Sequence, residues 1–384
     1  MTEASVDQHD VKVSVAMITY NHEAYVAEAI ESVLMQGTDF GFELVVGEDC
    51  STDGTRSIVC SHRDRHPDRM RVVLRKRNIG MIPNFIATLE ACQGQYIALC
   101  EGDDYWTDPH KLQKQVHFLE AHPECSLCFH NVTILQEGEN GRARLRYPIE
   151  QKRMWSIEDI LFRNPISTCS VMFRSGLVDE FPEWYYTLPM GDWPLWVLLA
   201  TKGYAGYIDE DMATRRLHAG GVFTGRNVVQ WASTVLDAYD VMDRSLDFAH
   251  HERVRQGKVD YLDNVAQGFL LQASTSMSAR EAVSSFLDLW LRHTDSPPPS
   301  ERVLLGRLYA ARFFRAASVG DRGGVMRSAL SLAVHDPSHL TERGVWSILV
   351  QAALGERAWK CLKNVGAGLL RSRQGASGCE AGIR

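Results

Sequence analysis

The stretch Glu-Gly-Asp-Asp-Tyr-Trp at residues 101–106 places three carboxylates within four positions, directly after a short apolar run. Like charges at this spacing raise each other's pKa unless a cation or hydrogen-bond donors intervene. Carboxylate oxygens suit hard divalent cations, which bridge one or two carboxylates and a diphosphate while keeping some waters. Asp103 and Asp104 are therefore candidate ligands of a divalent metal ion. The alternative interpretation is a solvated acidic turn that binds nothing.

The elements that would position these carboxylates are short strands alternating with helices. Four apolar, strand-like segments occupy residues 12–18, 42–46, 71–74 and 96–100. Helical patterns separate them, first at residues 26–34, then from Asp53, which we expect to cap a helix through about Ser61, and then near residues 83–92. This alternation predicts the α/β class, with a largely parallel sheet and helices on both faces.

Polar residues gather where each predicted strand ends, which is where open α/β sheets bind their ligands. The candidates are Thr19, Tyr20 and Glu23 after the first strand, Asp49 after the second, Asn78 after the third, and Asp103 and Asp104 after the fourth. Asp49 could accept a hydrogen bond from a base or ribose, and Tyr20 offers a ring for a base to stack on. Since neither a P-loop nor a GxGxxG loop follows the first strand, a metal would have to meet phosphate charge.

Four motifs in this order resemble the signatures of the family 2 inverting glycosyltransferases of GT-A fold. They occupy residues 13–21, 42–55, 78–80 and 101–104, and the similarity runs from about residue 11 to residue 225. The resemblance implies a nucleotide-diphospho-sugar transferase fold over residues 11–225. It also implies transfer of a sugar from a nucleotide-diphosphate donor to an acceptor hydroxyl with inversion, with Mg²⁺ or Mn²⁺ as cofactor. Such a reaction would serve cell-surface polysaccharide or other glycan biosynthesis.

The resemblance also assigns roles to single residues. Tyr20 and Asp49 match the positions that hold the nucleotide base, whereas Asp103 and Asp104 match the acidic motif that contacts ribose and binds the metal. This chain departs from the usual family pattern at three positions. Because the substitutions keep charge where charge matters, we expect them to affect nucleotide preference more than activity. They are Glu48 and Cys50, in place of Asp and Gly, and Glu101, in place of the leading Asp of the acidic motif.

A further carboxylate, Asp192, lies in the segment at residues 189–200, where the family places its catalytic base. The family usually has Glu-Asp before Trp at this point, and Gly191 and Asp192 stand there in this chain. Pro194 is tolerated in a first helical turn, so Asp192 should stand where a helix begins. It is thus a candidate general base, an N-cap, or both. Trp193 and Trp196 could line a sugar pocket or belong to the core.

Residues 215–223 resemble the family's terminal basic loop, in which basic groups meet the leaving diphosphate. Arg216 and His218 are the matching positions, and Arg215 departs from the usual Tyr. A histidine of this kind could instead be a structural residue. The resemblance therefore adds Arg216 and His218 to the candidate donor-binding residues.

Composition indicates a soluble globular protein with room for two or three domains. The 384 residues are 45% hydrophobic and 23% charged, no apolar run is long enough to span a bilayer, and the polar start lacks a signal-peptide core. We expect a cytoplasmic location with nine reduced cysteines. Cys125 and Cys128, flanked by His122 and His130, could form half of a zinc site, but no second CxxC completes it, which favours a buried strand.

Beyond the similarity, a helical extension is expected at residues 226–295, followed by a Pro-rich linker and a basic helical module at 301–384. This module carries a net charge of +7, which leaves −14 for residues 1–300. It could associate with the inner face of an anionic membrane, contact an acidic partner or form a homodimer, or simply expose solvated basic faces. No nucleic-acid partner is expected.

Two other functions stay open at this level. A nucleotidyltransferase also combines an α/β sheet with metal-binding carboxylates, although it usually has a Gly-rich phosphate loop near the first strand. A non-catalytic protein that binds a nucleotide sugar could have kept the fold without the activity. The presence of Asp103, Asp104 and Asp192 argues against this second alternative.

Overall fold

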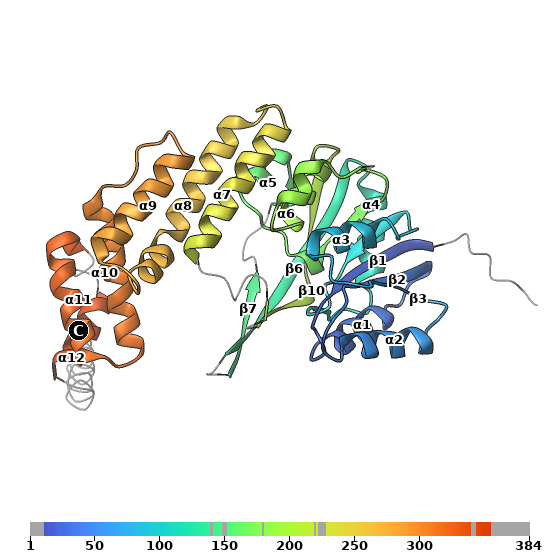
Figure 1. The fold of residues 1–384 in the computed structure, drawn as a ribbon, viewed down its shortest axis with the longest axis horizontal. Coiled ribbons are helices and arrows are strands. Elements are labelled where there is room, and N and C mark those ends of the chain that lie inside the picture. The colour runs from blue at the N-terminus through green and yellow to red at the C-terminus, as the bar shows by residue number, and fades with distance from the viewer. Residues whose placement is uncertain are drawn as a thin grey trace, which may run out of the picture. The chain divides into compact units, whose positions relative to one another are not determined.

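Figure 1 shows the fold in a computed structural model, which describes residues 11–138, 141–147, 152–178, 180–218, 220–221, 228–338 and 343–354. The chain divides into two compact units. The first comprises residues 1–226 and 234–257, and the second comprises residues 227–233 and 258–384. This division assigns part of the predicted helical extension to each unit.

The first unit contains a ten-stranded mixed sheet with the order β3-β2-β1-β4-β9-β6-β10-β5, and β7 and β8 pair with β6 and β10. The strands are β1 (Val11–Thr19), β2 (Gly41–Glu48), β3 (Met70–Leu74), β4 (Tyr96–Leu99), β5 (Tyr105–Trp106), β6 (Cys125–Gly138), β7 (Gly141–Tyr147), β8 (Met154–Trp155), β9 (Met172–Arg174) and β10 (Tyr204–Leu217). The neighbours from β3 to β4 are parallel, as are β6 and β10. The short β9 runs antiparallel between β4 and β6.

Helices cover both faces of this sheet. They are α1 (Val26–Leu34), α2 (Thr55–Arg65), α3 (Met81–Leu89), α4 (Lys111–Ala121), α5 (Ile157–Phe162) and α6 (Asp192–Ala200), with 3-10 turns η1 (Thr168–Ser170) and η2 (Glu183–Thr187). In Figure 1, α1 and α2 lie on one side of the strands and α3 on the other. The predicted α/β class is confirmed.

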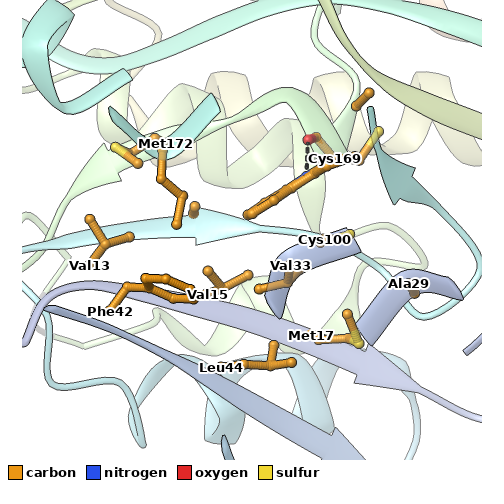
Figure 2. Packing of buried hydrophobic residues seen from close by; sticks show 14 of the residues in the cluster. Val13, Val15, Met17, Ala29, Val33, Phe42, Leu44, Cys100, Cys169 and Met172 are labelled. Carbon is orange, nitrogen blue, oxygen red and sulfur yellow. Dashed lines mark hydrogen bonds between the residues drawn. The ribbon is translucent and has the colours of Figure 1, made fainter. Parts of the chain in front are cut away.

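The core of the first unit follows directly from the two periodicities of the sequence. Alternate residues of β1, Val13, Val15 and Met17, are fully buried on one face of the sheet. They pack with Phe42 and Leu44 of β2 and with Ala29 and Val33 of α1, which lie four apart on one side of that helix (Figure 2). Burial of this face holds the carboxyl ends of β1 and β2 in register, with Thr19 beside Glu48.

Two local predictions have clear outcomes here. The segment from Cys125 to Cys128 is a buried stretch of β6, and all seven described cysteines are free, as expected. The prediction that Asp53 caps the next helix is wrong, because α2 has Gly54 as its N-cap. The Asp53 carboxylate instead accepts the N–H groups of Thr55 and Glu23, since aspartate readily bonds the backbone two residues on.

The remaining helices are α7 (Val228–Ser245), α8 (His251–Ala273), α9 (Ala279–His293), α10 (Glu301–Ser318), α11 (Arg322–His335) and α12 (Arg343–Leu354). Residues 295–300 form the irregular connection expected from their prolines. The last part of the predicted basic module, residues 355–384, lies outside the described residues. Within the described part of the chain, we find no helix with the length and apolar character needed to cross a bilayer.

A lysine is fully buried in the first unit. Lys111 begins α4, donates to Gln115 Oε1 at 2.6 Å and lies 4.0 Å from the centre of the Trp106 ring. Burial lowers the pKa of Lys111 from 10.5 to about 8. A folded chain therefore releases this proton at a lower pH than an unfolded chain does.

This burial predicts a pH-dependent stability. Between about pH 8 and 10.5 only the unfolded state keeps the proton on Lys111, so the parent should gain stability as pH rises through that window. From pH 7.5 to 10, its free energy of unfolding should rise by about 2 kcal/mol relative to that of Lys111→Met, since other groups titrate equally in both proteins. Denaturant unfolding at both pH values measures this difference. A difference that does not change with pH would contradict the burial of a titrating lysine.

Candidate active site

The site lies at the carboxyl ends of the parallel strands, where the predicted polar residues meet. Beyond β4, the chain continues beside β1, because Gly102 N donates to Ile18 O at 3.0 Å. On the other side of β1, Asp49 N donates to Thr19 O at 3.1 Å. The acidic motif, Thr19 and Asp49 are thus tied by backbone bonds to the end of one strand.

Gly102 allows the acidic motif to pass close over β1. A Cβ atom at this position would lie 2.7 Å from Thr19 Oγ1 and 2.8 Å from Thr19 Cβ. Thr19 is itself buried, so it has little room to move away. The glycine between Glu101 and Asp103 is therefore required by packing at the site.

This close approach predicts that Gly102→Ala lowers the free energy of unfolding by roughly 1–3 kcal/mol, the usual cost of overpacking. Gly268→Ala is the matched control. Gly268 lies inside α8, where an added Cβ would meet nothing within 4 Å, and alanine there should stabilise the helix by up to roughly 1 kcal/mol. Denaturant unfolding of the two variants should give changes of opposite sign. Equal stability of Gly102→Ala and the parent would contradict the packing described here.

The two aspartates of the motif have different surroundings. Asp104 is buried, and its Oδ1 accepts Arg216 N at 2.8 Å; burial and the charge of Asp103 raise its pKa to about 7. The Asp103 carboxylate instead faces two histidines, with His218 Nε2 at 3.2 Å and His22 Nε2 at 3.9 Å. Burial raises the pKa of Asp103, but its hydrogen bond with His218 and the charge of His22 outweigh burial and lower it.

Glu101, Asp103 and Asp104 form a set of donors that fits a metal ion. One carboxylate oxygen from each lies within 4.8 Å of the other two. Burial, followed by the charges of Asp103 and Asp104, raises the pKa of Glu101 well above its usual range. Oxygen-only donors suit hard cations such as Mg²⁺ and Mn²⁺. A divalent cation would also relieve the repulsion among these carboxylates.

Arg216 and His218 reach this motif from β10 and the residue after it. The Arg216 guanidinium donates to Asp103 O at 2.7 Å, pairs with Glu28, and lies 4.4 Å from the centre of the Tyr105 ring. His218 is buried between Asp103 and Tyr25, whose ring centre is 4.6 Å from its own. Both predicted basic residues therefore contact the acidic motif, about 110 positions away in the sequence.

On the β2 side, Asp49 organises the loop that follows β3. Its Oδ1 accepts Ile79 N at 2.8 Å and its Oδ2 accepts Gly80 N at 3.0 Å. Asn78 Oδ1 also accepts Gly80 N, at 3.0 Å, and Gly80 has a φ of 91° that glycine tolerates. Asp49 and Asn78 are thus brought together as expected. The two backbone N–H groups already occupy part of the hydrogen-bonding capacity of Asp49.

The residues after β1 divide by exposure. Tyr20 is 41% exposed, which leaves it accessible for stacking. Thr19 is buried, and its Oγ1 lies 3.3 Å from His22 Nδ1. The Glu23 carboxylate accepts Gly54 N at 2.7 Å, which ties it to the start of α2. Tyr20 is therefore the member of this group best placed to contact a ligand.

Asp192 is the first residue of α6 and not its cap. Gly191 is the N-cap, because its carbonyl accepts Leu195 N, and no side chain caps this helix. The interpretation of Asp192 as an N-cap is therefore wrong. Burial raises the pKa of Asp192, while a hydrogen bond from the Trp193 backbone and the charge of Arg215 act in the opposite direction. Trp193 and Trp196 are buried core residues, and Trp193 Nε1 donates to Ile160 O at 2.8 Å.

Asp192 and Glu101 line the same pocket in the first unit. Its other walls are mostly apolar and include Ile82, Phe85 and Met190. Glu101 and Asp192 come from different segments of the chain. Their charges act on each other, since the charge of Asp192 helps to raise the pKa of Glu101. The pocket therefore joins the acidic motif to the candidate base.

Arg215 is the site residue that sequence reasoning missed. Burial lowers the pKa of Arg215, but three surrounding carboxylates raise it above its usual value, those of Asp104, Glu101 and Asp192. Arg215 thus supplies a positive charge among the carboxylates of the site. The adjacent pair Arg215-Arg216, near the end of β10, is the signal in the sequence that could have identified it.

Comparisons with known proteins identify the family of this chain and its fold. Residues 14–181 match the family described as Glycosyl transferase family 2. An uncharacterized protein of Mycobacterium tuberculosis is 38% identical over 251 residues, which cover 64% of this chain and 71% of that protein. The putative glycosyltransferase EpsE of Bacillus subtilis is 30% identical over 196 residues, or 51% of this chain and 69% of that protein. The structure of S. aureus TarS 1-349 in complex with UDP-GlcNAc covers 84% of this chain and 92% of its own, with a TM-score of 0.52; at 19% identity, this likeness concerns the fold.

Proposed function

The chain belongs to glycosyl transferase family 2, and we propose that it transfers a sugar from a nucleotide-diphosphate donor to an acceptor hydroxyl with inversion. The observation that carries this proposal is the meeting of the acidic motif, two basic residues and a pocket carboxylate at one edge of the sheet. Asp103 lies against His218 and Arg216, and Glu101 shares a pocket with Asp192. The acceptor would be a glycan or another hydroxyl compound.

The donor would lie along the ends of β1, β2 and β4. Tyr20 would stack on the base, and Asp49 and Asn78 would shape the loop that receives the base and ribose. Asp103 would contact the ribose, while Arg216 and His218 would meet the diphosphate. The positions of Arg216 and His218 beside Asp103 support this order, because leaving-group charge is best met by fixed basic groups.

The acidic motif would hold a divalent cation through Asp104 and Asp103, with Glu101 as a third donor. When bound, Mg²⁺ or Mn²⁺ would stabilise the negative charge that develops on the departing diphosphate. Hydrogen bonds fix the position of both carboxylates. Arg216 N donates to Asp104, and His218 Nε2 is hydrogen-bonded to Asp103.

Asp192 would act as the general base. Its carboxylate would take the proton of the acceptor hydroxyl while that oxygen bonds to the anomeric carbon and the bond from this carbon to the diphosphate breaks. A single displacement of this kind inverts the anomeric centre. The charge of Arg215 favours the ionised form of Asp192, and the apolar walls formed by Ile82 and Phe85 limit the access of water.

A donor screen tests the function. We expect one nucleotide-diphosphate sugar, with Mn²⁺ present, to raise the apparent unfolding free energy of the full chain by about 2.7 kcal/mol at 100 times its dissociation constant. Addition of acceptors should then release nucleoside diphosphate. Release of sugar 1-phosphate, by cleavage between the two phosphates of the donor, would instead indicate a nucleotidyltransferase, and donor binding without turnover for any acceptor would indicate a binding protein.

A further inference from the structure

A cavity of about 480 Å³ lies within the second unit, between the end of α8 and the helices α10 and α11. Three arginines line it, Arg312 and Arg315 from α10 and Arg327 from α11. Hydroxyl side chains of Ser274, Thr275 and Ser331 complete much of the polar wall. Its volume lies in the range of sites that bind small molecules.

The helical spacing explains why these residues share one cavity. Arg312 and Arg315 are three apart on α10, and Arg327 and Ser331 are four apart on α11, so each pair lies on one helix face. The two helices also share an apolar core that includes Phe313 and Val325. Arg315 and Arg327 are exposed at the edge of this core and Arg312 is half-buried, so all three guanidinium groups are accessible to a ligand in the cavity.

The positive charge of the cavity is only partly balanced. Asp321 is the carboxylate in its wall; it caps α11 by accepting Gly324 N and lies 3.8 Å from Arg327 Nη2. Arg312 donates to Ser274 O, at 3.4 Å, and Arg315 makes no side-chain hydrogen bond or ion pair within the described ranges. Since arginine does not deprotonate in proteins, the cavity keeps a net positive charge that would favour an anionic ligand.

The hydroxyl groups indicate what else this anion should carry. Ser274 donates to Leu271 O, Thr275 to Gln272 O and Ser331 to Arg327 O. With their protons engaged on backbone carbonyls, these oxygens are left as acceptors. A matching ligand would therefore supply several hydrogen-bond donors in addition to its negative charge.

We propose that this cavity binds an anionic saccharide, a sugar unit that carries a phosphate or carboxylate group. The planar forks of Arg312, Arg315 and Arg327 pair with such groups through two parallel hydrogen bonds, and the sugar hydroxyls donate to the serine and threonine oxygens. Binding of this ligand in the second unit is independent of the function proposed for the first unit.

Calorimetric titration of the full chain tests the proposal, with glucose 6-phosphate and glucuronate as probes. At least one of them should bind at least about tenfold more tightly than both glucose and inorganic phosphate. Arg315→Gln combined with Arg327→Gln should weaken this binding at least about tenfold, as loss of charge-assisted hydrogen bonds implies. Arg280→Gln is the matched control; this side chain of α9 is 85% exposed, lies outside the cavity wall, and should leave the affinity unchanged.

A second variant guards against an effect on folding. Ser331→Asp adds a carboxylate to the cavity wall and should abolish binding, while unfolding curves of all variants should match that of the parent. Unchanged affinity in the double arginine variant, or no binding by the parent, would overturn the proposal. Equal affinity for inorganic phosphate would overturn the saccharide assignment, and so would binding seen only with phosphatidylglycerol vesicles.

The two proposals fail separately in this experiment. The same titration with Asp192→Asn should give the parent's affinity, because Asp192 belongs to the first unit and the cavity to the second. If no donor supports transfer but glucose 6-phosphate still binds, the proposed function fails and the cavity proposal stands. If transfer proceeds and neither probe binds, only the cavity proposal fails.

Discussion

Asp104→Asn should lower sugar transfer by at least about 10²-fold, remove its stimulation by Mn²⁺ and leave the fold intact. Asparagine has the same shape, and its Oδ1 can still accept Arg216 N, as Asp104 Oδ1 does. The change therefore removes charge without opening a cavity. Mn²⁺ binding by calorimetry should weaken in parallel with transfer, which gives a measurement independent of activity.

The stability of Asp104→Asn should stay equal to that of the parent or rise, although its transfer activity falls. Burial and the charge of Asp103 raise the pKa of Asp104 to about 7, so its ionised form is a cost to the folded state. At pH 8, Asp104→Asn should unfold at the same denaturant concentration as the parent or at a higher one. Asp64→Asn is the matched control for the loss of a carboxylate charge outside the site, because Asp64 is an exposed residue of α2 that pairs with Arg63. Full transfer activity in excess EDTA would refute the metal role and favour a plain acidic turn.

The sequence predicted the part of the site that local pattern determines. The continuous apolar runs of β1 and β2, which are buried on both faces, are typical of neighbouring parallel strands, and their common direction places Thr19 and Asp49 at one edge. Glu101 and its neighbours reach the same edge because they directly follow β4. For these residues, the strand boundaries alone were enough to predict proximity.

The remainder depends on contacts between distant segments, which no short pattern encodes. Arg216 meets Asp103 through the pairing of β10 within the sheet, and only the family resemblance had assigned Arg216 to the donor site. β9 has three residues, too few for a periodicity to identify an antiparallel strand. The arginines of α10 and α11 read as ordinary basic positions until the packing of the two helices places them around one cavity.

The pocket shared by Asp192 and Glu101 narrows the choice of catalytic base. The Glu23 carboxylate is bonded to Gly54 N at the start of α2, and Glu23 does not line this pocket. Glu101 does line it, but it also belongs to the candidate metal-binding group. Glu101→Gln should therefore weaken Mn²⁺ binding as well as transfer, whereas a change at Asp192 should affect transfer alone.

Asp192→Asn should depress sugar transfer by about 10² to 10⁴-fold, the usual contribution of a general base, while donor affinity stays within about twofold of the parent. Because Gly191 and not Asp192 is the N-cap of α6, even Asp192→Ala should keep the helix and show a similar loss. Donor binding by calorimetry and product release by a coupled assay measure the two quantities on the same preparations. Transfer by Asp192→Asn within about threefold of the parent would exclude Asp192 as the base and leave Glu101, the other carboxylate of this pocket, as the next residue to replace.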